Sequence, residues 1–353
     1  MPRRRQTVTI RHVAADAGVS LQTVSRVINN EPNVRPETIR RVRESIDRLA
    51  YVPSIAAQRM GGSRSRLIMA LNDRDRTIED WRRRDGSNWI DQMLLGGMLT
   101  CARHGYRMIV ELVDTHGDHI ESELLAAIAA LQPDGVLLTP PHSQDRTIID
   151  LLAARHIAIA RVGSLAPGPG ILLTMDDAGA ARLATEHLIG LGHRRIGFVA
   201  GSAEYELSEW RVEGWRAAMA SAALPAHDLL ARGDFGHASG RAAALALLGI
   251  EHPPTALIAS SDLMTLAALE VAGERGLAVP GDLSLVSFDD TPLVRFAQPP
   301  LTAIVQPIAA VIEAAVESIV HSEQGGSVVD QPLVIPCHLA IRDSTAPPRG
   351  TTR

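Results

Sequence analysis

One short stretch near the start of the chain combines side chains that can hydrogen-bond to nucleic-acid bases. Residues 21–26 read LQTVSR. On a helix, the amide of Gln22 and the guanidinium of Arg26 can each make paired hydrogen bonds to a base edge, and Leu21 can touch a thymine methyl group. Neighbouring hydroxyl and amide groups can contact bases or phosphates. The pattern therefore predicts a surface that reads nucleic-acid sequence.

Three short helices must position this surface. Thr9 can cap a helix over residues 10–17, and Ser20, after a glycine turn, can cap a second helix over 21–29. A proline opens a third helix shortly afterwards. A glycine turn between two short helices is typical of the helix-turn-helix, whose second helix enters the major groove. The alternative is an ordinary three-helix bundle with polar exposed faces.

Charge separates this head from the rest of the chain. The protein has 353 residues and a net charge of −5, and all of its basic side chains other than histidine are arginines. Residues 1–66 hold 13 arginines against 5 acidic residues, a charge of +8, whereas residues 67–353 hold 22 against 35, a charge of −13. A basic head on an acidic body indicates that the head meets a polyanion. The alternative is a solvated basic face.

Composition indicates a globular protein of two or three domains. Apolar residues make up 46% of the chain, which is enough for a full core, and the two cysteines are too few for a disulfide framework. No apolar stretch follows the basic start, so we expect no signal peptide. The longest charge-free stretch, 296–312, contains three prolines and is not expected to span a membrane. These features predict a cytoplasmic protein.

Beyond residue 66 the sequence alternates between strand-like and helix-like segments. This alternation is typical of a parallel sheet covered by helices on both faces. The segments fall into two sets, so we expect two doubly wound parallel α/β lobes with a ligand site in the cleft at the carboxyl ends of the strands. The predicted strands are 67–71, 107–112, 136–139, 157–162, 195–199, 256–260 and 284–288, and the predicted helices are 90–104, 121–131, 145–156, 178–191, 209–222, 238–248 and 263–275.

The connection after the first predicted strand is unusually long and contains two tryptophans. Residues 72–89 span 18 positions and include Trp81 and Trp89. Because the connection leaves the carboxyl end of a strand, it is expected at the mouth of the cleft. Sugars stack their C–H faces on flat aromatic rings, so our hypothesis is that Trp81 or Trp89 covers a saccharide. The alternative is a mobile surface loop with Trp89 packed at the start of the next helix.

Other candidate motifs are weaker. Residues 114–119 read DTHGDH, with side chains that could bind a metal, but a second cluster of ligands is missing. We therefore favour a polar loop at the edge of the pocket, with Asp114 facing a ligand, and expect neither a metal nor another cofactor. The sequence contains no phosphate-binding glycine loop and no paired nucleophile and base. We therefore expect that the protein is not an enzyme.

The head carries a dense and specific motif. Residues 13–20 read VAADAGVS and residues 23–29 read TVSRVIN, and the pattern continues through LAYVP at 49–53 into AAQRM at 56–60. On these motifs the head resembles the lactose-repressor/galactose-repressor family of bacterial transcription regulators. His12 departs from the family, which usually has an acidic residue completing the first helix cap.

The resemblance implies a hinge helix over residues 54–60 that orders on operator DNA. Met60 stands where the family has a leucine that wedges into the minor groove, and an unbranched thioether can still do so. Two glycines follow at once and disfavour a longer helix, so we expect the hinge to be disordered without DNA. The expected DNA-binding residues are Thr9, Ser20, Leu21, Gln22, Thr23, Ser25, Arg26, Asn29, Ala57 and Met60.

The body carries further matching motifs, and they extend the resemblance over nearly the whole chain. They include EHL at 186–188, LGHRRI at 191–196, FDD at 288–290 and PPLT at 299–302. The body thereby resembles the sugar-binding core of the same family, which is itself similar to the periplasmic binding proteins. The resemblance implies that the chain crosses between the lobes three times, near residues 174, 305 and 331.

The resemblance also implies ligand contacts. Arg211 would donate to sugar hydroxyls, and Asp289 would accept from a pair of them. The alternatives are a helix-surface arginine and a turn aspartate. Ser261 stands where the family commonly has asparagine and offers one donor where the amide has two, and Asp262 is predicted to cap the helix that follows. The candidate ligand-binding residues are Arg211, Asp289, Ser261, Trp81, Trp89 and Asp114.

These observations predict three segments. Residues 1–52 form a helix-turn-helix DNA-binding domain, 53–66 a hinge helix and linker, and 67–353 a two-lobed core for ligand binding and dimerisation. The expected lobes are about 67–174 with 306–330, and about 175–305 with 331–345. No leucine heptads follow residue 344, so we expect dimers.

The function that we expect is sequence-specific regulation of transcription. A homodimer would repress carbohydrate catabolic genes at a palindromic, double-stranded operator until a sugar inducer releases it. The alternatives are an activator or corepressor-dependent regulator that answers to a non-sugar small molecule, and a sugar-binding protein without a regulatory role.

Overall fold

The computed structural model describes residues 8–28, 32–51, 65–83, 88–326 and 331–349. The chain forms two compact units, Met1–Ser65 and Arg66–Arg353. In the described residues no helix is long and apolar enough to cross a membrane.

Over its described residues, 8–28 and 32–51, the first unit is a bundle of three helices. They are α1 (Ile10–Ala17), α2 (Leu21–Ile28) and α3 (Pro36–Arg48). The turn after α1 requires a glycine, because Gly18 has a φ of 63°, in the left-handed region. Small and β-branched side chains fill the core between the helices, and its buried members are Val13, Ala14, Ala17, Val24, Val27, Val42 and Tyr51.

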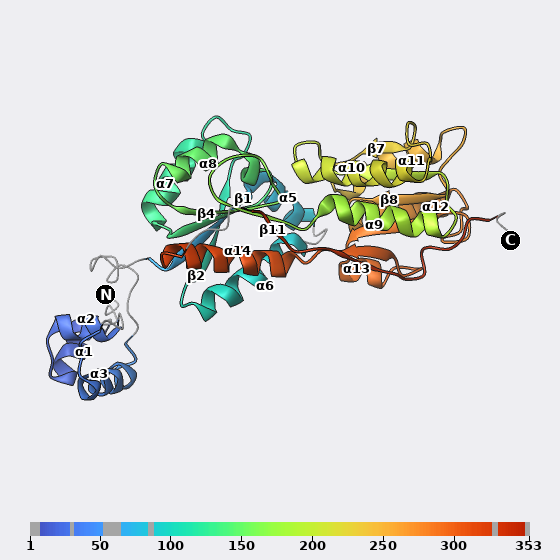
Figure 1. The fold of residues 1–353 in the computed structure, drawn as a ribbon. Helices are drawn as coiled ribbons and strands as arrows, with labels where there is room; N and C mark the ends of the chain where they lie inside the picture. Colours follow the sequence, from blue (N-terminus) through green and yellow to red (C-terminus); the bar gives the residue numbers. More distant parts are fainter. Residues whose placement is uncertain (1–7, 29–31, 52–64, 84–87, 327–330, 350–353) are drawn as a thin grey trace, which may run out of the picture. The chain divides into compact units, whose positions relative to one another are not determined.

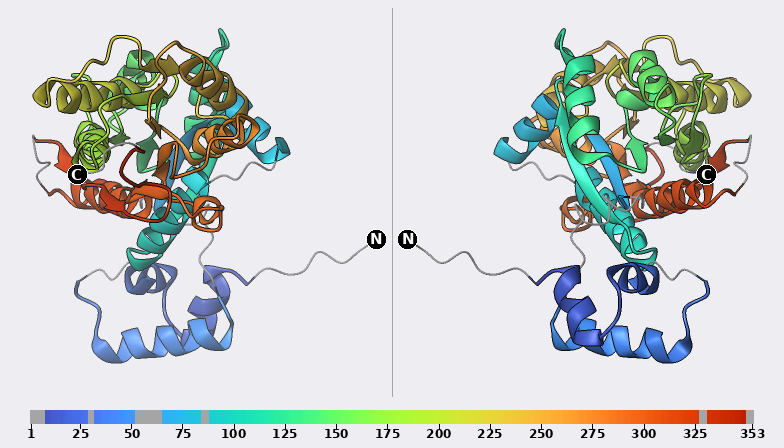
Figure 2. Two further views of the ribbon diagram at one scale, coloured as in Figure 1. Left: turned by 90° about the vertical axis from the view of Figure 1, so that its right-hand side faces the viewer. Right: turned by 90° about the vertical axis from the view of Figure 1, so that its left-hand side faces the viewer.

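The first lobe of the second unit is built on a parallel sheet in the order β11-β5-β4-β3-β1-β2. Its central strands are buried on both faces. Helices α6 (Asn88–Arg103) and α14 (Ile308–Glu323) cover one face and lie side by side (Figures 1 and 2). Helices α7 (Ile120–Leu131) and α8 (Arg146–Ala153) cover the other. The strands are β1 (Leu67–Asp73), β2 (Arg107–Val113), β3 (Gly135–Leu138), β4 (Ala158–Val162), β5 (Ile171–Thr174) and β11 (Leu333–Val334).

The second lobe repeats this design in the order β12-β10-β9-β8-β6-β7, with only β12 antiparallel. Helices α9 (Asp177–Gly190) and α10 (Glu206–Ser221) cover one face, and α11 (His237–Leu248) and α12 (Asp262–Glu274) the other. The short α13 (Pro292–Arg295) follows β9. The strands are β6 (Ile196–Ala200), β7 (Leu230–Arg232), β8 (Ala256–Ala259), β9 (Ser284–Asp289), β10 (Thr302–Val305) and β12 (His338–Ala340).

The chain passes between the lobes three times. The first two passages follow β5 and β10, beside the predicted positions near residues 174 and 305. The third lies between Val334 and His338, a few residues later than predicted. The shift arises because Leu333 and Val334 still pair with β5 at the edge of the first sheet.

The prediction of one long connection over residues 72–89 is wrong. Strand β1 runs to Asp73, and helix α5 (Arg74–Arg83) follows directly. The carboxylate of Asp73 accepts from the backbone N–H of Arg76 at 2.8 Å, and an ion pair joins Glu79 to Arg83 one turn later. These local contacts stabilise a helix that lacks an apolar stripe.

Candidate functional site

Helix α2 presents a polar surface on the first unit. Leu21, Gln22 and Arg26 are exposed, and Leu21 exposes 44% of its surface, although it is apolar. Val24 and Val27 are buried against the other two helices. The side chains that can read base edges therefore share the outward face of a helix whose opposite face is fixed in the core.

Two of the predicted DNA-binding residues cap helices. The Ser20 hydroxyl accepts from the Thr23 backbone N–H at 3.2 Å at the start of α2. At the start of α1 the Thr9 backbone N–H donates to Nδ1 of His12 at 3.0 Å, so an imidazole completes this cap. Asn29, with Ala57 and Met60 of the expected hinge, lies outside the described residues.

A buried hydroxyl and an ion pair hold α3 against α1. Ser45 donates to a carboxylate oxygen of Asp16 at 2.6 Å, and Arg48 pairs with the same oxygen at 2.5 Å. These two contacts, the Ser45 hydrogen bond first, lower the pKa of Asp16 below its ordinary value. These contacts between α1 and α3 therefore stabilise the bundle that carries α2 on its surface.

In the second unit, the carboxyl ends of the two sheets face each other. Gln144, which follows β3, accepts from the Glu206 backbone N–H at 3.1 Å. The Glu206 carboxylate accepts from the Ser164 hydroxyl, beyond β4, at 3.0 Å. Arg76, beyond β1, donates to the hydroxyl of Tyr205, beyond β6, at 2.7 Å. The strand-end loops of both lobes therefore contact each other at the place where a ligand site is predicted for doubly wound lobes.

The centre of this site is a chain of hydrogen bonds that starts at Arg211. Its side chain is 4% exposed and contacts Asp177 at 2.8 Å and the Ser260 carbonyl at 2.8 Å. With the Gln306 amide oriented to satisfy its neighbours, the amide oxygen accepts from Arg211 at 2.6 Å and the nitrogen donates to Asp289 at 2.7 Å. Arg211 and Asp289 are thus brought together through a glutamine that the sequence did not single out.

Asp289 at the end of this chain is partly buried, and the neighbouring Asp262 is fully buried. Burial raises the pKa of Asp289, against the opposing effect of Arg211. Burial, followed by the charge of Asp289, raises the pKa of Asp262 to about 7. Asp262 accepts from the Ser287 hydroxyl and from the Thr291 backbone N–H at 2.6 Å. Of these two groups, Asp262 therefore has a pKa close to neutral pH.

The prediction that Asp262 caps α12 is wrong, because Ser261 does so. The Ser261 hydroxyl accepts from the Met264 backbone N–H at 3.2 Å and donates to the Phe235 carbonyl at 2.8 Å. Asp262 is instead drawn to Ser287 and the loop after β9. The hydroxyl of Ser261 is thus engaged by protein groups on both sides.

The two tryptophans differ in their surroundings. Trp89 packs partly buried against the core of the first lobe, which favours the packing alternative for this residue over a cover for a saccharide. Trp81 lies near the end of α5 and exposes 51% of its surface. Trp89 is therefore part of the packing of the first lobe, whereas Trp81 is on the surface.

The loop after β2 uses Asp114 for its own turn. One carboxylate oxygen accepts from the backbone N–H groups of His116 at 3.2 Å and Gly117 at 2.9 Å. The next residue, Thr115, lies 2.8 Å from Nε2 of His142, and burial lowers the pKa of that imidazole. Within the described ranges, no group of three or more His, Cys, Asp or Glu side chains could hold a metal ion.

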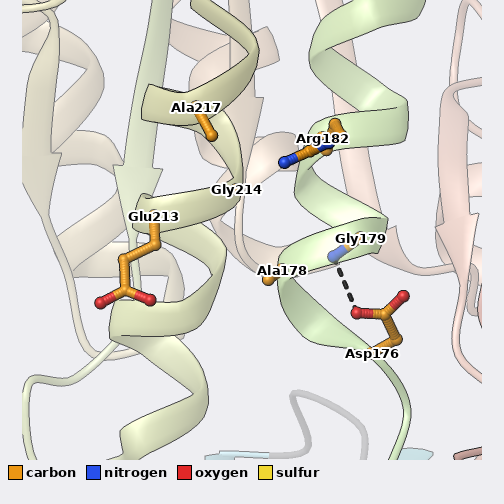
Figure 3. Close-up of a pocket in the computed structure, with 7 residues that line it drawn as sticks. All are labelled: Asp176, Ala178, Gly179, Arg182, Glu213, Gly214 and Ala217. Atoms are coloured by element: carbon orange, nitrogen blue, oxygen red, sulfur yellow. Dashed lines mark hydrogen bonds between the residues drawn. The ribbon is translucent and has the colours of Figure 1, made fainter.

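A separate groove of about 550 Å³ runs between α9 and α10 (Figure 3). Gly214 allows the helices to approach, because a Cβ there would lie 2.0 Å from the Ala178 carbonyl oxygen. The charged side chains of the groove, Asp176, Arg182 and Glu213, are all exposed to solvent. The groove shares no residue with the site between the strand ends.

Known proteins combine the same two parts. A profile described as bacterial regulatory proteins of the lacI family matches residues 9–54, and one described as a periplasmic binding protein-like domain matches residues 185–345. The HTH-type transcriptional regulator CelR of Thermobifida fusca is 32% identical over 277 residues, which is 77% of this chain and 79% of that protein.

Solved structures show the same likeness over almost the full length. A complex of the transcriptional regulator CelR with cellobiose matches with a TM-score of 0.72 and 29% identity, over 96% of this chain and 99% of that one. A Lac repressor dimer bound to operator and the anti-inducer ONPF matches with a TM-score of 0.81 and 26% identity, over 97% and 100%. A helix-turn-helix unit joined to two parallel α/β lobes defines a DNA-binding transcription regulator. The chain belongs to the lacI family of bacterial regulatory proteins.

Proposed function

We propose that this regulator represses carbohydrate catabolic genes and leaves a palindromic operator when a sugar binds between its lobes. The observation that carries the proposal is the hydrogen-bonded chain from Arg211 through Gln306 to Asp289 at the facing strand ends. A guanidinium, an amide and a carboxyl group in a row offer the donors and acceptors that sugar hydroxyls require. The CelR relative was solved with cellobiose, which supports a saccharide as the effector.

We further propose that residues 1–52 form the DNA-binding domain, with Leu21, Gln22 and Arg26 of α2 in the major groove. Thr23 and Ser25 border this surface and would contact the backbone or bases, as would Asn29. Thr9 and Ser20 contribute through the helix caps that they form. Residues 53–66, including Ala57 and Met60, would form the hinge.

The remaining residues, 67–353, would bind the effector and pair with a second copy of the chain. Helix α6 exposes three apolar side chains at helical spacing, Leu95 (49%), Met98 (55%) and Leu99 (61%). A contiguous exposed apolar patch favours a protein partner. A symmetric dimer matches the two half-sites of a palindrome, and the similar Lac repressor was solved as a dimer on its operator.

Effector binding would act on DNA through the arrangement of the lobes. A sugar held by groups from both lobes favours the closed arrangement in proportion to its differential affinity. A coupling of about 1–3 kcal/mol is typical of such regulators and changes operator affinity by roughly 5–150-fold.

The experiment that tests this function is retention of fragmented DNA from the protein's own source, followed by sequencing. The expected result is one palindromic motif, or a few, next to genes for carbohydrate uptake or breakdown. Gln22→Ala combined with Arg26→Ala should abolish enrichment of the motif, because each paired base contact contributes about 1–3 kcal/mol of discrimination. Arg40→Ala on α3, also exposed, is the matched control and should keep the motif. Absence of retention at low salt would contradict the proposal.

A further inference from the structure

Two stacked aromatic rings, which we call the aromatic face, lie in the second lobe near the chain from Arg211 to Asp289. Tyr205 and Phe235 stack with centroids 5.7 Å apart and planes 18° apart. The ring of Phe235 lies directly on the backbone of Gly201, because a Cβ there would come within 2.0 Å of a ring carbon. Phe235 also has a φ of 73°, which is uncommon for a bulky residue. The local backbone is thus shaped to hold this ring in place.

A guanidinium from the first lobe lies over both rings. The central carbon of Arg76, on α5, is 5.2 Å from the centroid of Tyr205 and 5.4 Å from that of Phe235. Its nitrogens donate to the Tyr205 hydroxyl at 2.7 Å and to the Asp234 carbonyl at 3.4 Å. The electron-rich faces of two rings are therefore occupied by a cation of the same chain.

The surrounding charges favour a cation at this place. The positive charge of Arg76 is one of the causes that lower the pKa of Asp234, and it opposes the rise in the pKa of Asp289. Burial raises the pKa of Tyr205, and the negative charges of Asp73 and Glu204 add to that rise. Carboxyl groups of both lobes therefore lie near the Arg76 guanidinium and the Tyr205 hydroxyl, and removal of Arg76 would take a positive charge away from Asp234 and Asp289.

The aromatic face is continuous with the proposed effector site. The guanidinium carbon of Arg211, which is hydrogen-bonded to Gln306, lies 6.0 Å from the centroid of Phe235. A ring whose hydroxyls bond to Arg211 and Asp289 would therefore place its C–H face on Phe235, where Arg76 now lies.

We propose that Arg76 is the specificity-determining residue of this site, because its guanidinium fills the aromatic face of Tyr205 and Phe235 and an effector must displace it to bind. This inference rests on the proposed function, which identifies the place where the effector binds. The competition between Arg76 and the effector for the rings is argued from the contacts of Arg76 alone. Arg76 would thereby select a saccharide that has one continuous C–H face. Such a face can replace the cation on the rings, while the hydroxyls of the saccharide bond to the displaced guanidinium.

The test uses methylguanidinium chloride, a free copy of the Arg76 head group, on the full chain without DNA or sugar. Arg76→Ala empties the aromatic face, so this variant should bind methylguanidinium saturably, with a millimolar dissociation constant at least about tenfold below that of the wild type, measured by calorimetry against sodium chloride of equal ionic strength. Arg82→Ala, an exposed arginine on the same helix, is the matched control and should behave as the wild type does.

A second variant keeps the test decisive if Arg76→Ala folds poorly. Arg76→Lys retains a charge but not the planar fork, and it should bind methylguanidinium with intermediate strength. Addition of Phe235→Ala to either variant should remove the binding. Equal weak binding by the wild type, Arg76→Ala and Arg76→Lys would overturn the proposal. The methylguanidinium experiment contains no DNA, so its failure would not contradict the proposed regulatory function. Failure of the protein to retain an operator would likewise not contradict methylguanidinium binding.

Discussion

Replacement of Arg211 by alanine should destabilise the second unit strongly, independently of any effect on a ligand. The Arg211 and Asp177 side chains are 4% and 1% exposed, and they meet at 2.8 Å. Removal of the arginine leaves a buried carboxylate without its counter-charge and frees the Ser260 carbonyl and the Gln306 oxygen. Breaking a buried ion pair from one side costs about 3–5 kcal/mol, so Arg211→Ala should lower the free energy of unfolding by that amount.

A double-mutant cycle measures the interaction free energy between Arg211 and Asp177 apart from their contacts with other residues. We expect Arg211→Ala with Asp177→Ala to cost less than the sum of the two single variants, with a coupling of about 1–3 kcal/mol, because the second substitution removes the charge that the first one strands. The assay is chemical denaturation followed by far-ultraviolet circular dichroism on the full chain. Additive effects, or a cost below about 1 kcal/mol for Arg211→Ala, would refute the view that Arg211 is first a buried structural cation.

Three further outcomes follow from particular contacts. His12→Ala should lose the cap of α1 and destabilise that helix by about 1 kcal/mol, seen as faster hydrogen exchange of its first amides. The pKa of Asp262 is raised from 3.8 to about 7 in the folded protein, so its contribution to stability is fully present below pH 3.8 and is lost as the pH rises towards 7; Asp262→Asn should flatten this part of a denaturation series across pH. Gly201→Ala should push the Phe235 ring aside and, combined with Arg76→Ala, abolish methylguanidinium binding in calorimetry.

The first unit was predictable because its signals are local. Thr9, Gly18 and Ser20 mark the ends of two helices within a dozen residues, and each forms the cap or turn that its chemistry favours. The alternation of buried strands and amphipathic helices likewise predicted two parallel lobes. These features depend on neighbours in sequence, so the chain alone reveals them.

Features that depend on distant neighbours were missed. Helix α5 buries only Thr77 and has charges on most of its surface, so no apolar period marks it. Both Ser261 and Asp262 can cap a helix. Ser261 is the cap because the Asp262 carboxylate accepts a hydrogen bond from Ser287 on strand β9, which is distant in sequence. Gln306 gives no local signal at all, because it acquires its role only when β10 brings it between Arg211 and Asp289.

In the proposed mechanism, a ligand bound between the lobes changes the affinity of the same chain for operator DNA. The most direct test is a single titration of the recovered palindrome with a panel of saccharides, reading operator affinity by fluorescence anisotropy and sugar binding by calorimetry on the same preparation. We expect that one saccharide binds and weakens operator affinity by roughly 5–150-fold, the range given by a coupling of about 1–3 kcal/mol. A saccharide that binds at the site while operator affinity stays constant would contradict it.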